Sequence, residues 1–251
     1  LLLVVGLFTR VRAVVLVVAI IAVVVVVVLN GRSDKPSGTA VPTGAAGMGA
    51  VWVDPASRGV TGTPVVTVYE DFRCPVCKLV EAGVGPVLRR LADEKAIELR
   101  YGFKTVIDSK VGGHSSRTAA SDALCAADQG AYPAYHEQLF ANQPEEPNPY
   151  TDAELNALAP KAGLSGTQLQ AWQRCADAGT YDAYVASVED TSFQAGVTGT
   201  PAIYLGGTPV NWGAYTDQTG SSWDTTGFEQ LLRSGTVPAD RVENSLPTLK
   251  D

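Results

Sequence analysis

The pattern of hydrophobic and polar positions divides the chain into three stretches. The first contains residues 13–29, which read AVVLVVAIIAVVVVVVL without a polar side chain. A helix of about 17–25 such residues crosses the hydrocarbon core of a bilayer, and Arg10 and Arg12 before it favour a cytoplasmic N-terminus. We therefore predict a cytoplasmic segment at 1–12 and a transmembrane signal anchor at 13–29. The rest of the chain would then be an extracytoplasmic part of a single-pass protein of the cell membrane.

A cleaved signal peptide is the alternative for this run. The apolar part of a signal peptide is usually about 7–15 residues long, and no A-x-A site directly follows the run. We expect the anchor to remain, although either alternative exports the residues that follow it.

The second stretch, residues 30–62, is rich in Gly, Ser, Pro, Thr and Ala and has few large apolar side chains. Such a composition buries too little surface to offset the entropy lost on ordering. It predicts a flexible linker. The third stretch, residues 63–251, has the pattern of a folded domain.

Within 63–251, short β-branched and apolar runs alternate with helical patterns. Strands are predicted at 64–69, 97–103, 201–205 and 208–212, and helices at about 75–95, in an Ala-rich block at about 115–195 that is broken near 143–149, and at 225–233. Pro86 should kink or interrupt the first helix. Strands that flank a helical block predict an α/β sheet with an inserted helical subdomain.

Charge and composition exclude some functions. The net charge is −7 and no cluster of Lys or Arg is present, so a nucleic-acid partner is disfavoured, because phosphates need a cationic patch. The two histidines, His114 and His136, leave little room for metal or histidine-based chemistry, and we interpret both as ordinary surface or hydrogen-bonded residues. Four cysteines remain, and two of them are close together.

That close pair is Cys74-Pro75-Val76-Cys77, which follows a predicted strand and opens a predicted helix. Free N–H groups and the partial positive charge at a helix N-terminus favour a thiolate on the first cysteine. A thiolate of lowered pKa both attacks and leaves readily. We predict Cys74 as the nucleophile and Cys77 as the resolving residue.

Two other uses of this pair are weaker. Half of a zinc site would need two further ligands, usually a second closely spaced pair, and Cys125 and Cys175 stand alone. A purely structural disulfide across so short a loop would stabilise little. We expect neither a metal nor a cofactor.

A second motif supports the redox interpretation. The segment EDFRCPVCK (70–78), a helical insertion and then GVTGTPAIYLGG (196–207) together resemble the DsbA-like branch of the thioredoxin superfamily, and most closely its membrane-anchored actinobacterial members. The resemblance implies a thioredoxin-like fold and a cis Thr200–Pro201 bond that binds substrate beside the active cysteines.

The resemblance also implies a function. It would be a protein dithiol–disulfide oxidoreductase that introduces disulfides into exported proteins with reduced cysteines. A membrane partner of the DsbB or vitamin K epoxide reductase type would re-oxidise it. The alternatives are a reductase or isomerase on the same scaffold, and a thioredoxin-like chaperone or binding module without redox turnover.

This chain departs from the family at two positions. Many relatives have a buried acidic proton acceptor six residues before the first cysteine, where this chain has Val68. Glu70 would lie on the same face of a strand, so it is either the candidate proton acceptor or a solvated side chain. Val76 replaces the histidine that stabilises the thiolate in the strongest oxidants, which predicts a milder oxidant.

Cys125 and Cys175 lie on predicted helices of the insertion. Because two unpaired thiols are uncommon in an exported protein, we expect a structural disulfide between them, as in similar actinobacterial proteins. A second redox pair that relays electrons is the alternative, without a CxxC spacing to support it.

Overall fold

The computed structural model describes residues 38, 40–45, 49–51 and 62–249. These residues belong to one compact unit, 34–251. The predicted cytoplasmic segment and transmembrane anchor lie outside the described residues. In the ranges that are described, no helix combines the length and the apolar character needed to cross a membrane.

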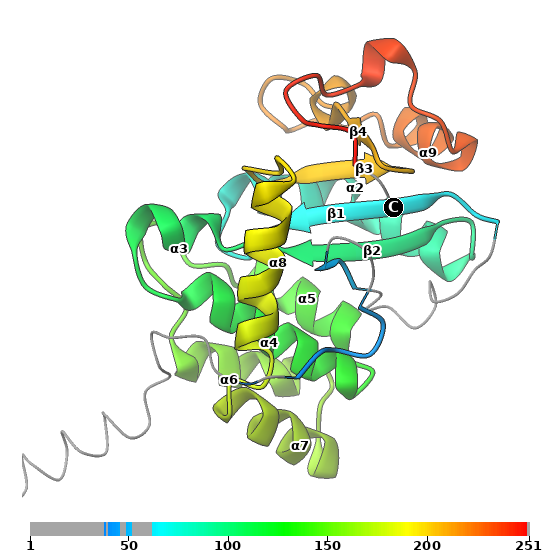
Figure 1. Ribbon diagram of the computed structural model, residues 1–251. Helices are drawn as coiled ribbons and strands as arrows, with labels where there is room; N and C mark the ends of the chain where they lie inside the picture. Colours follow the sequence, from blue (N-terminus) through cyan, green and yellow to red (C-terminus); the bar gives the residue numbers. More distant parts are fainter. Residues whose placement is uncertain (1–37, 39, 46–48, 52–61, 250–251) are drawn as a thin grey trace, which may run out of the picture. The chain divides into compact units, whose positions relative to one another are not determined.

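Four strands form one sheet in the order β2-β1-β3-β4 (Figure 1). The central strand β1 is parallel to β2 and antiparallel to β3, and β3 is antiparallel to β4. The strands are β1 (Val65–Glu70), β2 (Glu98–Phe103), β3 (Ala202–Leu205) and β4 (Thr208–Val210). The prediction of an α/β sheet is confirmed. The last strand ends earlier than expected, because Trp212 begins a 3-10 turn, Trp212–Tyr215.

Helices supply the rest of the fold. Those outside the central block are α2 (Pro75–Asp93), α9 (Thr225–Ser234) and a short 3-10 turn at Ala239–Arg241; those between β2 and β3 are α3 (Val106–Val111), α4 (Ser115–Asp128), α5 (Tyr132–Ala141), α6 (Asp152–Lys161), α7 (Gly166–Asp177) and α8 (Asp182–Gln194). In Figure 1, α2 lies behind the sheet and α8 crosses in front of it. The helical insertion therefore interrupts the chain between two strands of one sheet.

Of the kink or interruption expected at Pro86, the interruption does not occur, because α2 continues through this residue. A proline inside a helix removes one backbone hydrogen bond and crowds the preceding turn. Apolar side chains of α2 are buried on both sides of Pro86, among them Val84, Val87 and Leu88. Their packing keeps the helix continuous.

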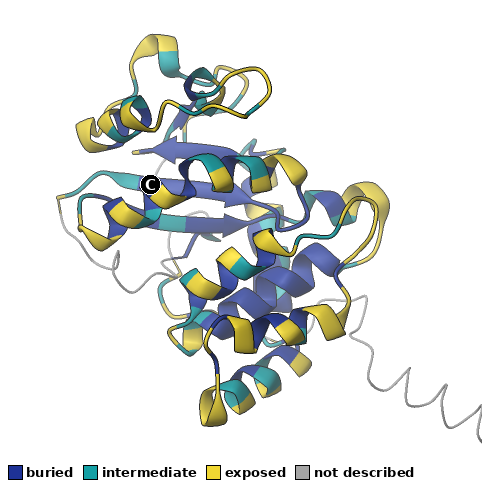
Figure 2. Cartoon of the chain, turned by 180° about the vertical axis from the view of Figure 1, so that it is seen from behind, coloured by how far each residue is buried: buried dark blue, intermediate teal, exposed yellow. Residues whose placement is uncertain are grey.

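The core has two parts. The larger joins one face of the sheet to α2 and the helical insertion, and buries Val66, Leu88 and Trp172. Figure 2 shows this continuous buried interior, with exposed residues on the outer helix faces. The smaller part contains Tyr69, Val197, Ala202 and Tyr204. Side chains of β1 alternate between these two parts of the core, so Glu70 lies on the same face of the sheet as Val66.

Part of the predicted linker packs against the domain. The N–H of Val51 donates to the carbonyl of Tyr101 at 2.8 Å, and the N–H of Tyr101 donates back at 2.9 Å. Tyr184 donates its hydroxyl hydrogen to the carbonyl of Gly49 at 2.6 Å. The expectation of a flexible linker throughout 30–62 is therefore wrong at 49–51. Composition understated order here, because β2 is an edge strand and the segment at Val51 pairs with it at Tyr101.

Candidate active site

The turn that carries the close cysteine pair is fixed by Asp71. Its carbonyl accepts the N–H of Cys74 at 2.9 Å, and its carboxylate accepts the N–H groups of Arg73 and Ile107, both at 2.9 Å. Burial raises the pKa of this carboxyl group to about 7, against the two backbone donors that lower it. Asp71 thus ties the end of β1 to the start of α3, and sequence analysis had not singled it out.

Cys74 is the N-cap of α2, with φ −75° and ψ 119°, and Pro75 follows in the first turn. Proline is well suited to this position, because its missing N–H would have no partner in the helix. Cys77 lies one turn further along. The local sequence therefore places both thiols at the positive end of a 19-residue helix.

The two thiols are free and buried, with 6% of Cys74 and 2% of Cys77 exposed. Hydrogen bonding from the Cys77 thiol, assisted by Thr200 and by the N–H groups of Cys77 and Val76, lowers the pKa of Cys74 to about 6 in spite of burial. Burial and the neighbouring Cys74 raise the pKa of Cys77 well above its ordinary value. The first thiol is thus poised to ionise near neutral pH and the second to keep its proton.

The Thr200–Pro201 peptide bond is cis and lies against this pair. The Cys74 Sγ atom is 3.6 Å from the carbonyl oxygen of Thr200, although 126 residues separate the two in sequence. Pairing of β1 with β3, which sets Tyr69 opposite Ala202, brings the two segments together. The structure therefore brings the predicted residues Cys74, Cys77, Thr200 and Pro201 together.

Glu70 is 3% exposed, so its interpretation as a solvated side chain is wrong. Its Oε1 atom is 2.7 Å from Nε2 of His136, and the Nδ1 atom of that ring is 3.8 Å from Glu81 on α2. Burial raises the pKa of Glu70, against the opposing effect of His136. Burial lowers the pKa of His136, but Glu70 and Glu81 outweigh it and the net shift is upward. The role of Glu70 as proton acceptor stays a prediction.

Replacing this buried carboxylate tests the pair. We expect Glu70→Gln to lower the free energy of unfolding by about 1–2 kcal/mol, because a charge-assisted hydrogen bond to His136 becomes a neutral one. Urea denaturation at neutral pH measures the loss. Glu94→Gln is the matched control, since Glu94 is exposed and solvent screens its ion pairs with Arg90 and Arg233, which therefore contribute little to stability. Equal losses in both variants would contradict a buried pair.

The other two cysteines form a disulfide that joins α4 to α7. Cys125 is fully buried, and its Cα atom is 5.8 Å from that of Cys175. Cys125 and Cys175 were predicted to form either a structural disulfide or a second redox pair. The structure contains the disulfide bond. In the described part of the chain, no group of three or more His, Cys, Asp or Glu side chains is arranged to hold a metal ion.

The amino-acid sequence is similar to a known protein family and to proteins of known role. A family model described as thioredoxin matches residues 54–222, about two thirds of the chain. Disulfide bond formation protein D of Bacillus subtilis is 25% identical over 151 residues, which are 59% of this chain and 65% of that protein. The alignment therefore spans slightly less than two thirds of that relative's length.

Two solved structures are also similar. Oxidised DsbA of Mycobacterium tuberculosis is 33% identical with a TM-score of 0.51, covering 61% of this chain and 79% of its own. The disulfide bond oxidoreductase DsbG of the same organism, in its reduced form, is 28% identical with a TM-score of 0.51, covering 72% and 88%.

Proposed function

This chain belongs to the thioredoxin family, in its DsbA-type branch, and on that premise we propose that it is a protein dithiol–disulfide oxidoreductase that introduces disulfides into exported proteins. The observation that carries the proposal is the asymmetry of the two thiols. The pKa of Cys74 is lowered to about 6 while that of Cys77 is raised. A cis Thr200–Pro201 bond lies beside them.

The asymmetry suits oxidation of substrate thiols. In the oxidised enzyme, a substrate thiolate attacks Sγ of Cys74, the Cys74–Cys77 bond breaks, and Cys77 leaves and takes a proton. A second substrate thiolate then attacks the substrate sulfur of the mixed disulfide and releases Cys74 as a thiolate. The substrate has lost two electrons and two protons, and the enzyme pair is reduced. A leaving thiol of low pKa speeds the last step.

The surroundings of the pair favour a polypeptide substrate. Val76 is 41% exposed, so an uncharged apolar side chain lies on the surface between the two cysteines. The peptide groups around cis Pro201 would bind the substrate backbone. Glu70, close in sequence to the cysteines and buried with His136, is the candidate proton acceptor for the resolving thiol.

We place the reaction outside the cytoplasm, with the domain held at the cell membrane by residues 13–29. The apolar run supports the anchor, and the Cys125–Cys175 disulfide supports an oxidising compartment. After each turnover the reduced pair must be re-oxidised. A membrane partner of the DsbB or vitamin K epoxide reductase type would accept its electrons.

The test is the equilibrium of the Cys74–Cys77 pair with glutathione in the purified protein. We expect a reduction potential between about −270 mV, the value for thioredoxin, and about −120 mV, that of a strong DsbA oxidant. The Val76 side chain offers the thiolate neither a charge nor a hydrogen bond, so the reduction potential should be more negative than that of the strong oxidant. A potential more negative than about −270 mV would instead favour a reductase.

A further inference from the structure

One segment of the helical insertion contacts the turn that carries the reactive cysteine. We call residues 143–150, between α5 and α6, the strap. Its hydrogen bonds reach three consecutive residues of the turn. Nε2 of Gln143 donates to the carbonyls of Phe72 and Cys74, at 2.8 and 3.0 Å. Nη2 of Arg73 donates to the carbonyl of Pro147, at 3.0 Å.

Gln143 occupies the central position in this arrangement. Both bonds come from a single amide nitrogen, whose two hydrogens are thereby used. The carbonyl of Cys74 also accepts the N–H of Lys78 at 3.2 Å, the first hydrogen bond of α2. One side chain from the insertion therefore fixes the backbone on both sides of Arg73, where the strand turns into the helix.

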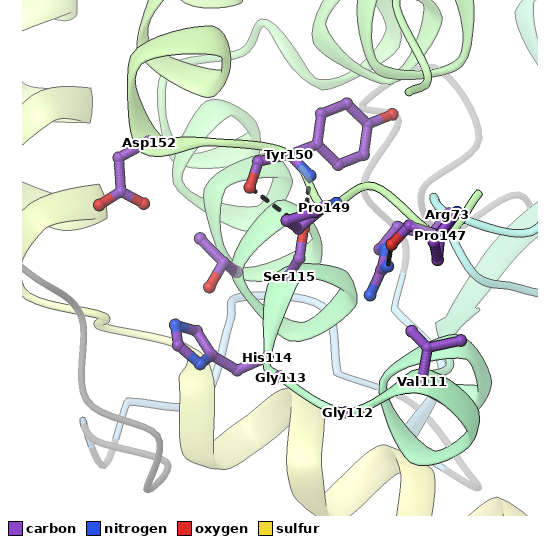
Figure 3. Close-up of a pocket in the computed structure, with 11 residues that line it drawn as sticks. Arg73, Val111, Gly112, Gly113, His114, Ser115, Pro147, Pro149, Tyr150 and Asp152 are labelled. Carbon is purple, nitrogen blue, oxygen red and sulfur yellow. Dashed lines mark hydrogen bonds between the residues drawn. The ribbon is translucent and has the colours of Figure 1, made fainter. Parts of the chain in front are cut away.

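The strap is not packed tightly on its flanks. A cavity of about 380 Å³ lies on one side, between Pro147–Tyr150 and the connection from α3 to α4 that includes His114 (Figure 3). A second cavity of about 280 Å³ is lined by Gln143, Tyr150 and Lys161. Within the strap, Tyr150 is buried in the core and donates its hydroxyl hydrogen to the carbonyl of Leu139 at 2.6 Å, whereas Gln143 is held to the turn by its two amide hydrogen bonds.

We propose that Gln143 is a positioning residue for the redox reaction, one that holds the first turn of α2 in the orientation that stabilises the Cys74 thiolate. The inference rests on the proposed use of Cys74 as the nucleophile. That thiolate is stabilised by the N–H groups of Val76 and Cys77 and by its neighbours Cys77 and Thr200. Hydrogen bonds weaken steeply as their angle departs from linear, so a turn released from Gln143 stabilises the anion less.

The experiment compares thiolate titrations of the full protein in its reduced form, followed by absorbance near 240 nm. Gln143→Met keeps the length of the side chain without a donor, and Gln143→Glu keeps the shape but offers acceptors alone. We expect the titration midpoint of Cys74, the pH at which half of its thiol is ionised, to rise by about one pH unit in Gln143→Met and by more in Gln143→Glu. The rate of alkylation at pH 6 should fall about fivefold in the Met variant, in proportion to the thiolate fraction.

Asn142→Ala is the matched control. Asn142 precedes the strap, and its amide donates to the carbonyl of Gln138 and not to the turn. It should leave the midpoint of Cys74 unchanged, even where thermal stability falls. A midpoint that stays at the wild-type value in Gln143→Met, or a smaller shift in Gln143→Glu than in Gln143→Met, would overturn the role of Gln143.

The wild-type protein separates this inference from the proposed function. If its Cys74 titrates near 8.5, the ordinary value of a cysteine, the assignment of Cys74 as an activated nucleophile fails. If the wild type titrates near 6 and the Gln143 variants do the same, that assignment stands and the positioning role alone is refuted.

Discussion

Replacement of Cys74 by serine should reduce the oxidation of a dithiol peptide to the rate of the uncatalysed reaction, whereas Cys77→Ser should give a protein that accumulates mixed disulfides. The first result is expected because a hydroxyl group cannot replace the thiolate as nucleophile or leaving group. The second is expected because the resolving thiol is absent, so the covalent intermediate persists. Non-reducing electrophoresis distinguishes the two variants after incubation with a peptide that contains a disulfide: the Cys74 thiolate of Cys77→Ser attacks that disulfide, releases one peptide thiol and keeps the other sulfur in a mixed disulfide.

The burial and acidity of the thiols determine which cysteine reacts first. Cys77 is buried and its pKa is raised, so iodoacetamide should modify Cys74 well before Cys77 in the reduced wild type. Modification of Cys77 first, together with mixed disulfides in Cys74→Ser, would reverse the two roles.

The reaction of Cys74 should also depend on pH in a defined direction. Because its pKa is lowered to about 6, the thiolate is present above that pH and is lost as the pH falls through it. Alkylation should therefore be constant above about pH 7 and fall about tenfold per unit below about pH 5.

The disulfide of the insertion should have the largest effect on stability. We expect the double variant Cys125→Ala/Cys175→Ala to lose about 4 kcal/mol in the free energy of unfolding, since a bridge across a separation of 50 residues restricts the unfolded chain strongly. Replacing both residues avoids a lone buried thiol, because Cys125 is fully buried. Guanidinium denaturation without reductant gives the difference.

The two cysteine pairs should also differ in how easily they are reduced and in whether they are needed for oxidation of a substrate. A low concentration of dithiothreitol should reduce a Cys74–Cys77 disulfide while Cys125–Cys175 stays closed, because a catalytic disulfide is the labile kind. The double variant, kept below its unfolding temperature, should still oxidise a dithiol peptide. Loss of that oxidation without loss of stability would show that Cys125 and Cys175 take part in electron transfer.

The sequence by itself predicted the four strands and the helix that begins at the close cysteine pair, because these depend on neighbours close in the chain, but it did not predict α3 or divide the helical block into α4 to α8. Strand β1 has a run of β-branched residues, and the start of α2 is marked by Pro75 beside two cysteines at i and i+3. The confirmed α/β class follows from the order of such runs. The Thr200–Pro201 motif was found through resemblance to a family, since a cis bond cannot be deduced from a Thr-Pro dipeptide.

The tertiary structure alone decided which polar groups meet at the site. Glu70 and His136 are 66 residues apart, and Gln143 is 69 residues from Cys74. Neither separation carries a periodic signal, because α5 and the strap reach the end of β1 only after the insertion has folded back on the sheet. The same reason explains why Val51, which lies in a segment predicted from composition to be flexible, pairs with Tyr101 of β2. Local patterns fix secondary structure, but the burial of a charge and its partner depends on contacts between distant segments.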